Sequence, residues 1–171
     1  MDEISFASGS LGSVPLLERV LRESISQIDP RMLLGYADPL GLPELRRQIA
    51  ELYRNGLTEE NILITSSAQQ ARGIVFDYLA SEGRSDIFVQ EPAYFGVLRI
   101  FREQWSSQVI PFEDLETIGD KLRTSESGVV YLTSNFHNPT GETLSSEKKT
   151  ELAQSVEGSG LVIVEDNPHD F

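Results

Sequence analysis

The stretch GVVYLTSNFHNPTG (Gly128 to Gly141) decides how this chain can fold. It runs an apolar, strand-like segment directly into Asn138-Pro139-Thr140-Gly141, and a helix-length amphipathic segment follows. Proline disfavours helical geometry in the residue before it, and glycine permits a sharp reversal of the chain. We therefore expect Asn138 to lie on a rigid loop at the end of a strand, with its amide directed into a crevice. An ordinary Asn-Pro turn is the alternative interpretation.

Other apolar runs repeat this arrangement, and amphipathic segments of helix length separate them. The runs are NILIT (61–65), DIFVQ (86–90), SQVIPF (107–112) and GLVIVED (160–166). Helices are predicted over residues 14–28, 42–56, 68–81, 94–105, 115–123 and 146–155. The alternation of strands and helices is typical of an α/β fold, with a mostly parallel sheet flanked by helices.

Composition narrows the class of protein. The 171 residues contain no cysteine, which excludes disulfides, thiol catalysis and thiolate metal sites, and no metal site is predicted. No apolar run approaches the roughly 20 residues of a membrane span, and the acidic start lacks an export signal, so we expect a cytoplasmic protein. The formal charge of −13 repels a phosphate backbone, so nucleic acid is not an expected partner.

Ligands of doubly wound sheets bind at the carboxyl ends of the strands, so the residues after each apolar run are candidates for a site. Ser66, Ser67, Ala68 and Gln69 follow residues 61–65 and open a predicted helix. Small residues at this position let backbone N–H groups and the helix dipole converge on an anion such as phosphate. The alternative is a plain serine N-cap.

Two further candidates follow other strands. Tyr94 comes after a proline at a strand end, where its ring is suited to stack on a flat ligand or simply to pack. Asp166 ends an aliphatic strand, so its carboxylate is expected to be partly desolvated and to need a partner. A cationic ring nitrogen and a hydrogen bond to nearby backbone are the two interpretations of that partner.

Together these motifs resemble the N-terminal half of the fold-type I, pyridoxal 5′-phosphate-dependent class I/II aminotransferases. The segments that carry the resemblance are YADPLGLPELRRQIA (36–50), ILITSSAQQA (62–71), VQEPAYFGVLRIF (89–101), NFHNPTGETLS (135–145) and LVIVEDNPHDF (161–171). They look most like the aminoadipate and kynurenine aminotransferases and the aminotransferase-like domains of MocR/GntR regulators. The resemblance implies an N-terminal arm and helix over residues 1–35. Residues 36–171 would then form the N-terminal part of the cofactor-binding large domain.

The resemblance also implies roles for the candidate residues. Asp166 would pair with the pyridine nitrogen of the cofactor, and Asn138 would donate a hydrogen bond to its phenolic oxygen. Tyr94 would stack on the cofactor ring. Its phosphate would be held by Ser67, Ala68 and Gln69.

The resemblance implies roles for further positions as well. Tyr36 would reach the phosphate bound by a partner subunit, because family sites lie at a dimer interface. Residues 8–12 (SGSLG) resemble the segment that lines the substrate pocket. Ser67 stands where the family usually has glycine. His169 stands where this branch usually has a tyrosine, so its imidazole N–H would take over the second hydrogen bond to the phenolic oxygen.

Family members also use a Schiff-base lysine and a C-terminal small domain, both beyond the Asp166 position. The lysines of this sequence are Lys121, Lys148 and Lys149, and none aligns with that role. Lys148 and Lys149 are interpreted as solvated surface charges. We therefore expect an incomplete aminotransferase that is inactive by itself and associates as a homodimer or with a complementing C-terminal half. Because such an incomplete chain would form only part of the family's parallel sheet, we expect it to expose an unpaired edge strand and apolar helix faces.

The implied activity is transfer of an amino group between an amino acid and a 2-oxo acid. The alternative is a non-catalytic effector domain of a MocR/GntR-type transcriptional regulator that senses pyridoxal phosphate. A generic nucleotide-binding α/β domain is a third interpretation, but the sequence has no glycine-rich phosphate motif.

Overall fold

The computed structural model describes residues 13–53, 55–84, 86–104 and 109–168. The chain divides into two compact units, Met1–Ile64 and Thr65–Phe171. The expected boundary between residues 35 and 36 concerns the domains of the family fold, and it stays a prediction. No helix in the described ranges combines the length and apolar character needed to cross a membrane.

The first unit is helical. Its elements are α1 (Pro15–Gln27), α2 (Pro30–Leu34), α3 (Pro43–Tyr53) and the 3-10 helix η1 (Glu59–Asn61). The three α-helices each begin with proline, whose missing N–H has no helical acceptor at that position anyway. The short α2 was not predicted, because its five residues are too few to show helical periodicity. Asp29 caps it by accepting a hydrogen bond from the N–H of Arg31 at 2.9 Å.

The predicted strand over residues 61–65 is wrong. Asn61 ends η1, and its Oδ1 accepts a hydrogen bond from the N–H of Thr58 at 3.0 Å. Ile62 is extended, but residues 62–65 join no sheet within the described ranges. The N–H of Ile64 bonds instead to the carbonyl of Leu40 at 2.9 Å. Gly41 adopts φ 101°, and a Cβ there would lie 2.4 Å from the Cβ of Ile64, so this apolar run packs against a loop.

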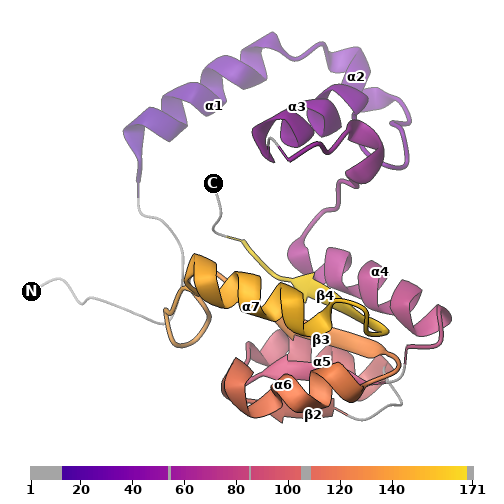
Figure 1. The fold of residues 1–171 in the computed structure, drawn as a ribbon. Coiled ribbons are helices and arrows are strands. Elements are labelled where there is room, and N and C mark those ends of the chain that lie inside the picture. Colours follow the sequence, from indigo (N-terminus) through magenta and orange to yellow (C-terminus); the bar gives the residue numbers. More distant parts are fainter. Residues whose placement is uncertain (1–12, 54, 85, 105–108, 169–171) are drawn as a thin grey trace, which may run out of the picture. The chain divides into compact units, whose positions relative to one another are not determined.

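The second unit contains a four-stranded parallel sheet (Figure 1). Its strands are β1 (Ile87–Gln90), β2 (Val109–Phe112), β3 (Gly128–Leu132) and β4 (Leu161–Glu165). Their order is β2-β1-β3-β4. The four apolar runs after residue 85 therefore form strands as predicted, and the α/β fold with a parallel sheet is confirmed.

Two helices cover each face of the sheet (Figure 1). They are α4 (Ala68–Ser81), α5 (Phe95–Gln104), α6 (Leu115–Thr124) and α7 (Ser146–Val156). Helices α4 and α5 pack with Val89 and Val129 on one face, and α6 and α7 pack with Phe88 and Val130 on the other. Because successive strand residues point to opposite faces, burial of both faces explains why the strands are apolar at nearly every position.

The strand order creates a crevice. The chain passes from β1 outward to β2 and then returns to the opposite side of β1 to form β3. The direction of winding thus reverses between β1 and β3, where the carboxyl ends of parallel strands leave room for a ligand. Strand β4 lies on the far side of β3, so its carboxyl end borders the same region.

Candidate functional site

A cavity of about 290 Å³ lies at the carboxyl ends of β1, β3 and β4. It is lined by Ser67, Ala68, Gln69, Arg72, Tyr94, Thr133, Phe136, Asn138, Asp166 and Pro168. The structure therefore brings together residues that the sequence placed after separate strands. Asp166 and Asn138 line one and the same cavity, as the sequence analysis requires.

The N-terminus of α4 supplies one wall of the cavity. Ser67 is the N-cap of this helix, and its side chain accepts a hydrogen bond from the N–H of Gln70 at 3.3 Å. The side-chain oxygen of Gln70 in turn accepts from the N–H of Ser66 at 2.7 Å. The N–H groups of Ala68 and Gln69 have no acceptor within the described part of the chain. Free N–H groups at the positive end of a helix dipole favour an anion.

Tyr94 follows β1 and is half-buried. Its ring centroid lies 4.7 Å from that of Phe95, with the two planes tilted by 52°. A Cβ on Gly96 would lie 2.4 Å from the Cε1 atom of Tyr94, so only glycine leaves space for this ring position. Gly96 was not predicted to contribute to the site, although a glycine in the first turn of a helix is a signal that the sequence offers.

Asp166 directly follows β4, and its N–H donates to the carbonyl of Leu132 at 2.9 Å. Its Oδ2 accepts a hydrogen bond from Nε of Arg72 at 2.9 Å and one from the hydroxyl of Tyr131 at 2.5 Å. Nη2 of Arg72 lies 2.7 Å from the same oxygen and completes an ion pair. The side chains of Arg72 and Asp166 are 13% and 14% exposed, so this is a largely buried ion pair. The expectation that the carboxylate is partly desolvated and partnered is met.

The partners themselves, Arg72 and Tyr131, were missed. Arg72 lies four residues after Ala68 on α4 and so shares a helix face with the N-terminal residues that line the cavity. Tyr131 is the one side chain with a hydroxyl in the otherwise aliphatic segment Gly128–Leu132. A polar atom in such a strand indicates a buried hydrogen bond, and this signal was available.

Burial and the Asp166 charge fix the protonation states of Tyr131 and Arg72. Burial, together with the hydrogen bond to Asp166 and its charge, raises the pKa of the Tyr131 phenol well above the ordinary value. Burial alone would lower the pKa of the Arg72 guanidinium, but its bonds to Asp166 raise it above the usual value. Around neutral pH Tyr131 is therefore a neutral donor and Arg72 a cation.

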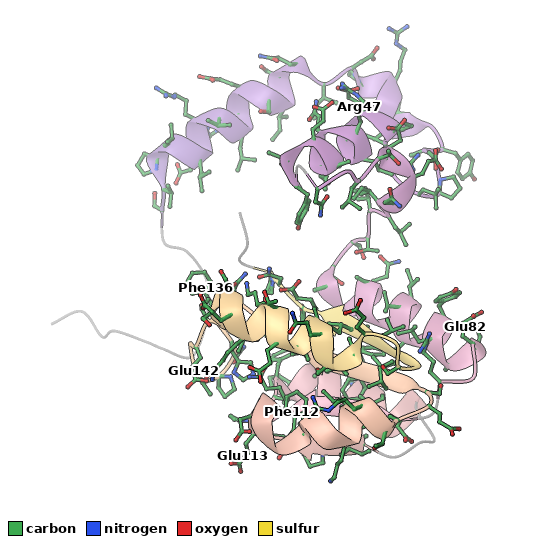
Figure 2. The ribbon with its side chains drawn as sticks, in the orientation of Figure 1. Arg47, Glu82, Phe112, Glu113, Phe136 and Glu142 are labelled. Carbon is green, nitrogen blue, oxygen red and sulfur yellow. The ribbon has the colours of Figure 1, made fainter. Side chains whose placement is uncertain are left out.

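Asn138 lies on an exposed loop that hydrogen bonds brace (Figure 2 labels Phe136 and Glu142 on it). The N–H of His137 donates to the carbonyl of Glu142 at 2.7 Å, and the N–H of Gly141 donates to the carbonyl of His137 at 2.6 Å. Gly141 adopts φ 77°, which is the left-handed region that glycine favours. The sharp reversal predicted from the sequence is therefore present.

Other candidates lie elsewhere. Tyr36 belongs to the first unit and is fully exposed, and its role toward a partner subunit stays a prediction. His169 and residues 8–12 lie outside the described residues, so their implied roles also stay predictions.

The interpretation of Lys149 as a solvated surface charge is wrong. Its Nζ donates to Oδ1 of the buried Asn135 at 2.9 Å, and it lines a second cavity of about 140 Å³ with Ser134 and Glu165. A long side chain can reach a buried acceptor from a helix whose pattern reads as surface. Lys148 is exposed as expected, and no lysine is among the residues that line the 290 Å³ cavity.

Comparison with known proteins agrees with this geometry. Residues 2–170 match the profile of the family described as aminotransferase class I and II. The 2-aminoadipate transaminase of Thermus thermophilus is 30% identical over 97% of this chain and 43% of its own length. The uncharacterized HTH-type transcriptional regulator YdfD of Bacillus subtilis is 26% identical over 97% of this chain and 36% of its own length.

Solved structures agree as well. The chain is similar to LysN, the α-aminoadipate aminotransferase of Thermus thermophilus, solved with N-(5′-phosphopyridoxyl)-L-leucine, at a TM-score of 0.66 and 29% identity. The match covers 87% of this chain and 38% of LysN, so the chain spans less than half the length of the relatives it matches. With its parallel sheet, its strand-end cavity and a profile match along nearly every residue, the chain belongs to the aminotransferase class I and II family.

Proposed function

We propose that this chain forms the pyridoxal 5′-phosphate-binding part of an aminotransferase that moves an amino group between an amino acid and a 2-oxo acid. The observation that carries the proposal is the 290 Å³ cavity at the strand ends. In it, N–H groups without an acceptor among the described residues, an aromatic ring, an amide and a buried carboxylate come from four separate segments.

The chemistry of these groups fits the cofactor. The phosphate needs N–H donors at a helix N-terminus, which Ser67, Ala68 and Gln69 would supply. A flat ring needs an aromatic face, which Tyr94 would supply. When bound, the cofactor would supply an electron sink for the substrate α-carbon, and a protonated ring nitrogen strengthens that sink.

Asp166 would hold that proton on the ring nitrogen. Its Oδ2 is fixed by Arg72 and Tyr131, while Oδ1 accepts no hydrogen bond from any described residue. Asn138 would donate its amide N–H to the phenolic oxygen from the braced loop, and His169 would add a second donor. Tyr36 would complete the phosphate site of a partner subunit in a homodimer, or a complementing C-terminal half would complete the site.

Isothermal titration calorimetry of the 171-residue chain with pyridoxal 5′-phosphate tests the proposal. We expect saturable binding that Asp166→Asn and Asn138→Ala each weaken about tenfold or more, since a hydrogen bond involving a charged group contributes roughly 1.5–3 kcal/mol. Asp77→Asn, an exposed position on α4, removes the same charge and should leave binding unchanged. No binding by the wild type, or equal effects of the two aspartate variants, would contradict the proposal.

The similarity to YdfD supports a second candidate, an effector domain that binds the cofactor without turning it over. Both candidates require the same cavity, so cofactor binding does not separate them. The coding sequence on either side of these residues does. A winged-helix segment upstream in the same polypeptide favours the regulator, and a downstream segment with a Schiff-base lysine favours the enzyme.

A further inference from the structure

Arg72 makes the two contacts that the proposed function assigns to the cofactor ring. It forms an ion pair with Asp166, with N–O distances of 2.7 and 2.9 Å. Its guanidinium carbon also lies over the ring of Tyr94, 5.4 Å from the ring centroid. Acid and aromatic face are thus both engaged by one side chain from α4.

Another hydrogen bond, to Gln69, also holds Arg72 in this position. Its Nη1 donates to the side-chain oxygen of Gln69 at 2.5 Å, and its side chain is only 13% exposed. Its charge is retained at neutral pH, because the bonds to Asp166 outweigh the effect of burial on the pKa of its guanidinium. The position is therefore a defined one and not that of a freely moving surface arginine.

A guanidinium and a protonated pyridine ring are chemically alike. Each is a planar cation that carries N–H donors in its plane and presents a flat face to an aromatic ring. A single carboxylate neutralises only one cation, and Asp166 already pairs with Arg72, so a second cation beside Asp166 would leave uncompensated positive charge in a partly buried site.

We propose that Arg72 is a built-in occupant of the ring site, which the cofactor ring displaces from Asp166 and Tyr94 when it binds. The inference rests on the proposed function and adds a regulatory element to it. While Arg72 is in place, Asp166 is not left as an unpaired buried charge. The apparent affinity for the cofactor then equals the intrinsic affinity multiplied by the fraction of molecules in which Arg72 has left the site.

Calorimetric titration with pyridoxal 5′-phosphate tests this, with Arg72→Met as the variant that keeps an apolar stem of similar length. We expect Arg72→Met to bind at least about tenfold more tightly than the wild type. The matched control is Arg47→Met on α3, an arginine paired with Glu44 and Glu51 at 2.6 Å (labelled in Figure 2). It should bind like the wild type.

The possible outcomes separate the two proposals. If the wild type and Arg72→Met bind with equal affinity, or if Arg72→Met binds more weakly, the displacement of Arg72 is refuted and the proposed function stands. If neither the wild type nor Arg72→Met binds pyridoxal 5′-phosphate, the proposed function is refuted together with this inference.

A second measurement needs only the wild-type chain and so does not depend on the folding of the variant. In ¹⁵N-labelled protein, the arginine Nε–H resonance of Arg72 reports its hydrogen bond to Asp166. Saturating pyridoxal 5′-phosphate should shift it toward the position of a solvent-exposed arginine. An unchanged Arg72 resonance in a chain that binds the cofactor would refute the displacement.

Discussion

Replacing Tyr131 by phenylalanine isolates one of the hydrogen bonds that hold Asp166. The ring would keep its packing, because the Tyr131 centroid lies 5.9 Å from that of Phe76 and 5.6 Å from that of Phe101. Only the hydroxyl and its 2.5 Å bond to Asp166 Oδ2 are lost. A hydrogen bond to a charged group contributes roughly 1.5–3 kcal/mol to stability.

The remaining contacts of Asp166 indicate where in this range the stability loss of Tyr131→Phe should fall. In the Tyr131→Phe variant, Oδ2 still accepts from Nε of Arg72 and keeps its ion pair with Nη2, so the carboxylate is not left unsatisfied. We therefore expect a loss near the lower limit, about 1.5 kcal/mol. In an Arg72→Met background the Tyr131 hydroxyl is the last donor to the Asp166 carboxylate among the described residues, and its removal should cost about 3 kcal/mol. The difference, about 1.5 kcal/mol, is the coupling energy between Tyr131 and Arg72.

Equilibrium urea denaturation of the four proteins in this double-mutant cycle measures these values, with the slope m expected to stay constant. Because burial and the Asp166 charge raise the pKa of Tyr131, the phenol stays protonated, and the difference should not vary between about pH 6 and 9. A loss below about 0.5 kcal/mol in both backgrounds would refute the hydrogen bond as a stabilising contact.

Three further predictions concern other parts of the second unit. Gly96→Ala places a Cβ 2.4 Å from Cε1 of Tyr94, and this overpacking should destabilise the protein by about 1–3 kcal/mol in urea denaturation and weaken cofactor binding in calorimetry. Leu122→Ala empties a fully buried site between α6 and the sheet and should cost about 2–5 kcal/mol by the same denaturation assay. Burial lowers the pKa of His137, so the unfolded chain takes up its proton first as the pH falls. The stability that neutral His137 contributes is therefore present above the ordinary histidine pKa of about 6.5 and declines as the pH falls below it, and His137→Gln should flatten this decline in denaturation at a series of pH values.

Each of these three predictions has a control variant or a result that would contradict it. Gly73→Ala on α4 adds a Cβ with no atom within 4 Å and should stabilise the helix by about 0.5–1 kcal/mol. If Gly96→Ala behaves like it, the close contact with Tyr94 is not present in solution. Leu21→Ala on α1, at 60% exposure, should cost much less than Leu122→Ala, and equal losses would contradict the assigned core. A pH profile that His137→Gln leaves unaltered would exclude His137 as its cause.

The sequence predicts those parts of the fold that local patterns control. Helix α4 begins at Ala68 and ends at Ser81, as the sequence predicts. The strands after residue 85 are predicted because burial on both faces leaves an unbroken apolar run. The run over residues 61–65 is apolar as well, but a 3-10 turn that ends at Asn61 and the hydrogen bond of Ile64 to a loop carbonyl override strand formation.

The candidate site is predicted to the extent that residues at strand ends must converge. Asn138, Tyr94 and Asp166 do line one cavity. The partner of Asp166 could not be predicted, because Arg72 lies 94 residues away in the sequence and reads as an ordinary polar position on α4. Nor does a local pattern indicate that Lys149 reaches the buried Asn135.

The bond between Arg72 and Asp166 also bears on the order of folding. It closes a loop of 94 residues, and Asp166 reaches its place only after β4 has paired with β3. Contacts of such long sequence separation form late, because chain entropy opposes them until intervening elements have docked. A ligand that needs Asp166 in position would therefore bind only chains in which β4 has paired with β3, and it would stabilise those chains relative to chains in which this pairing has not formed.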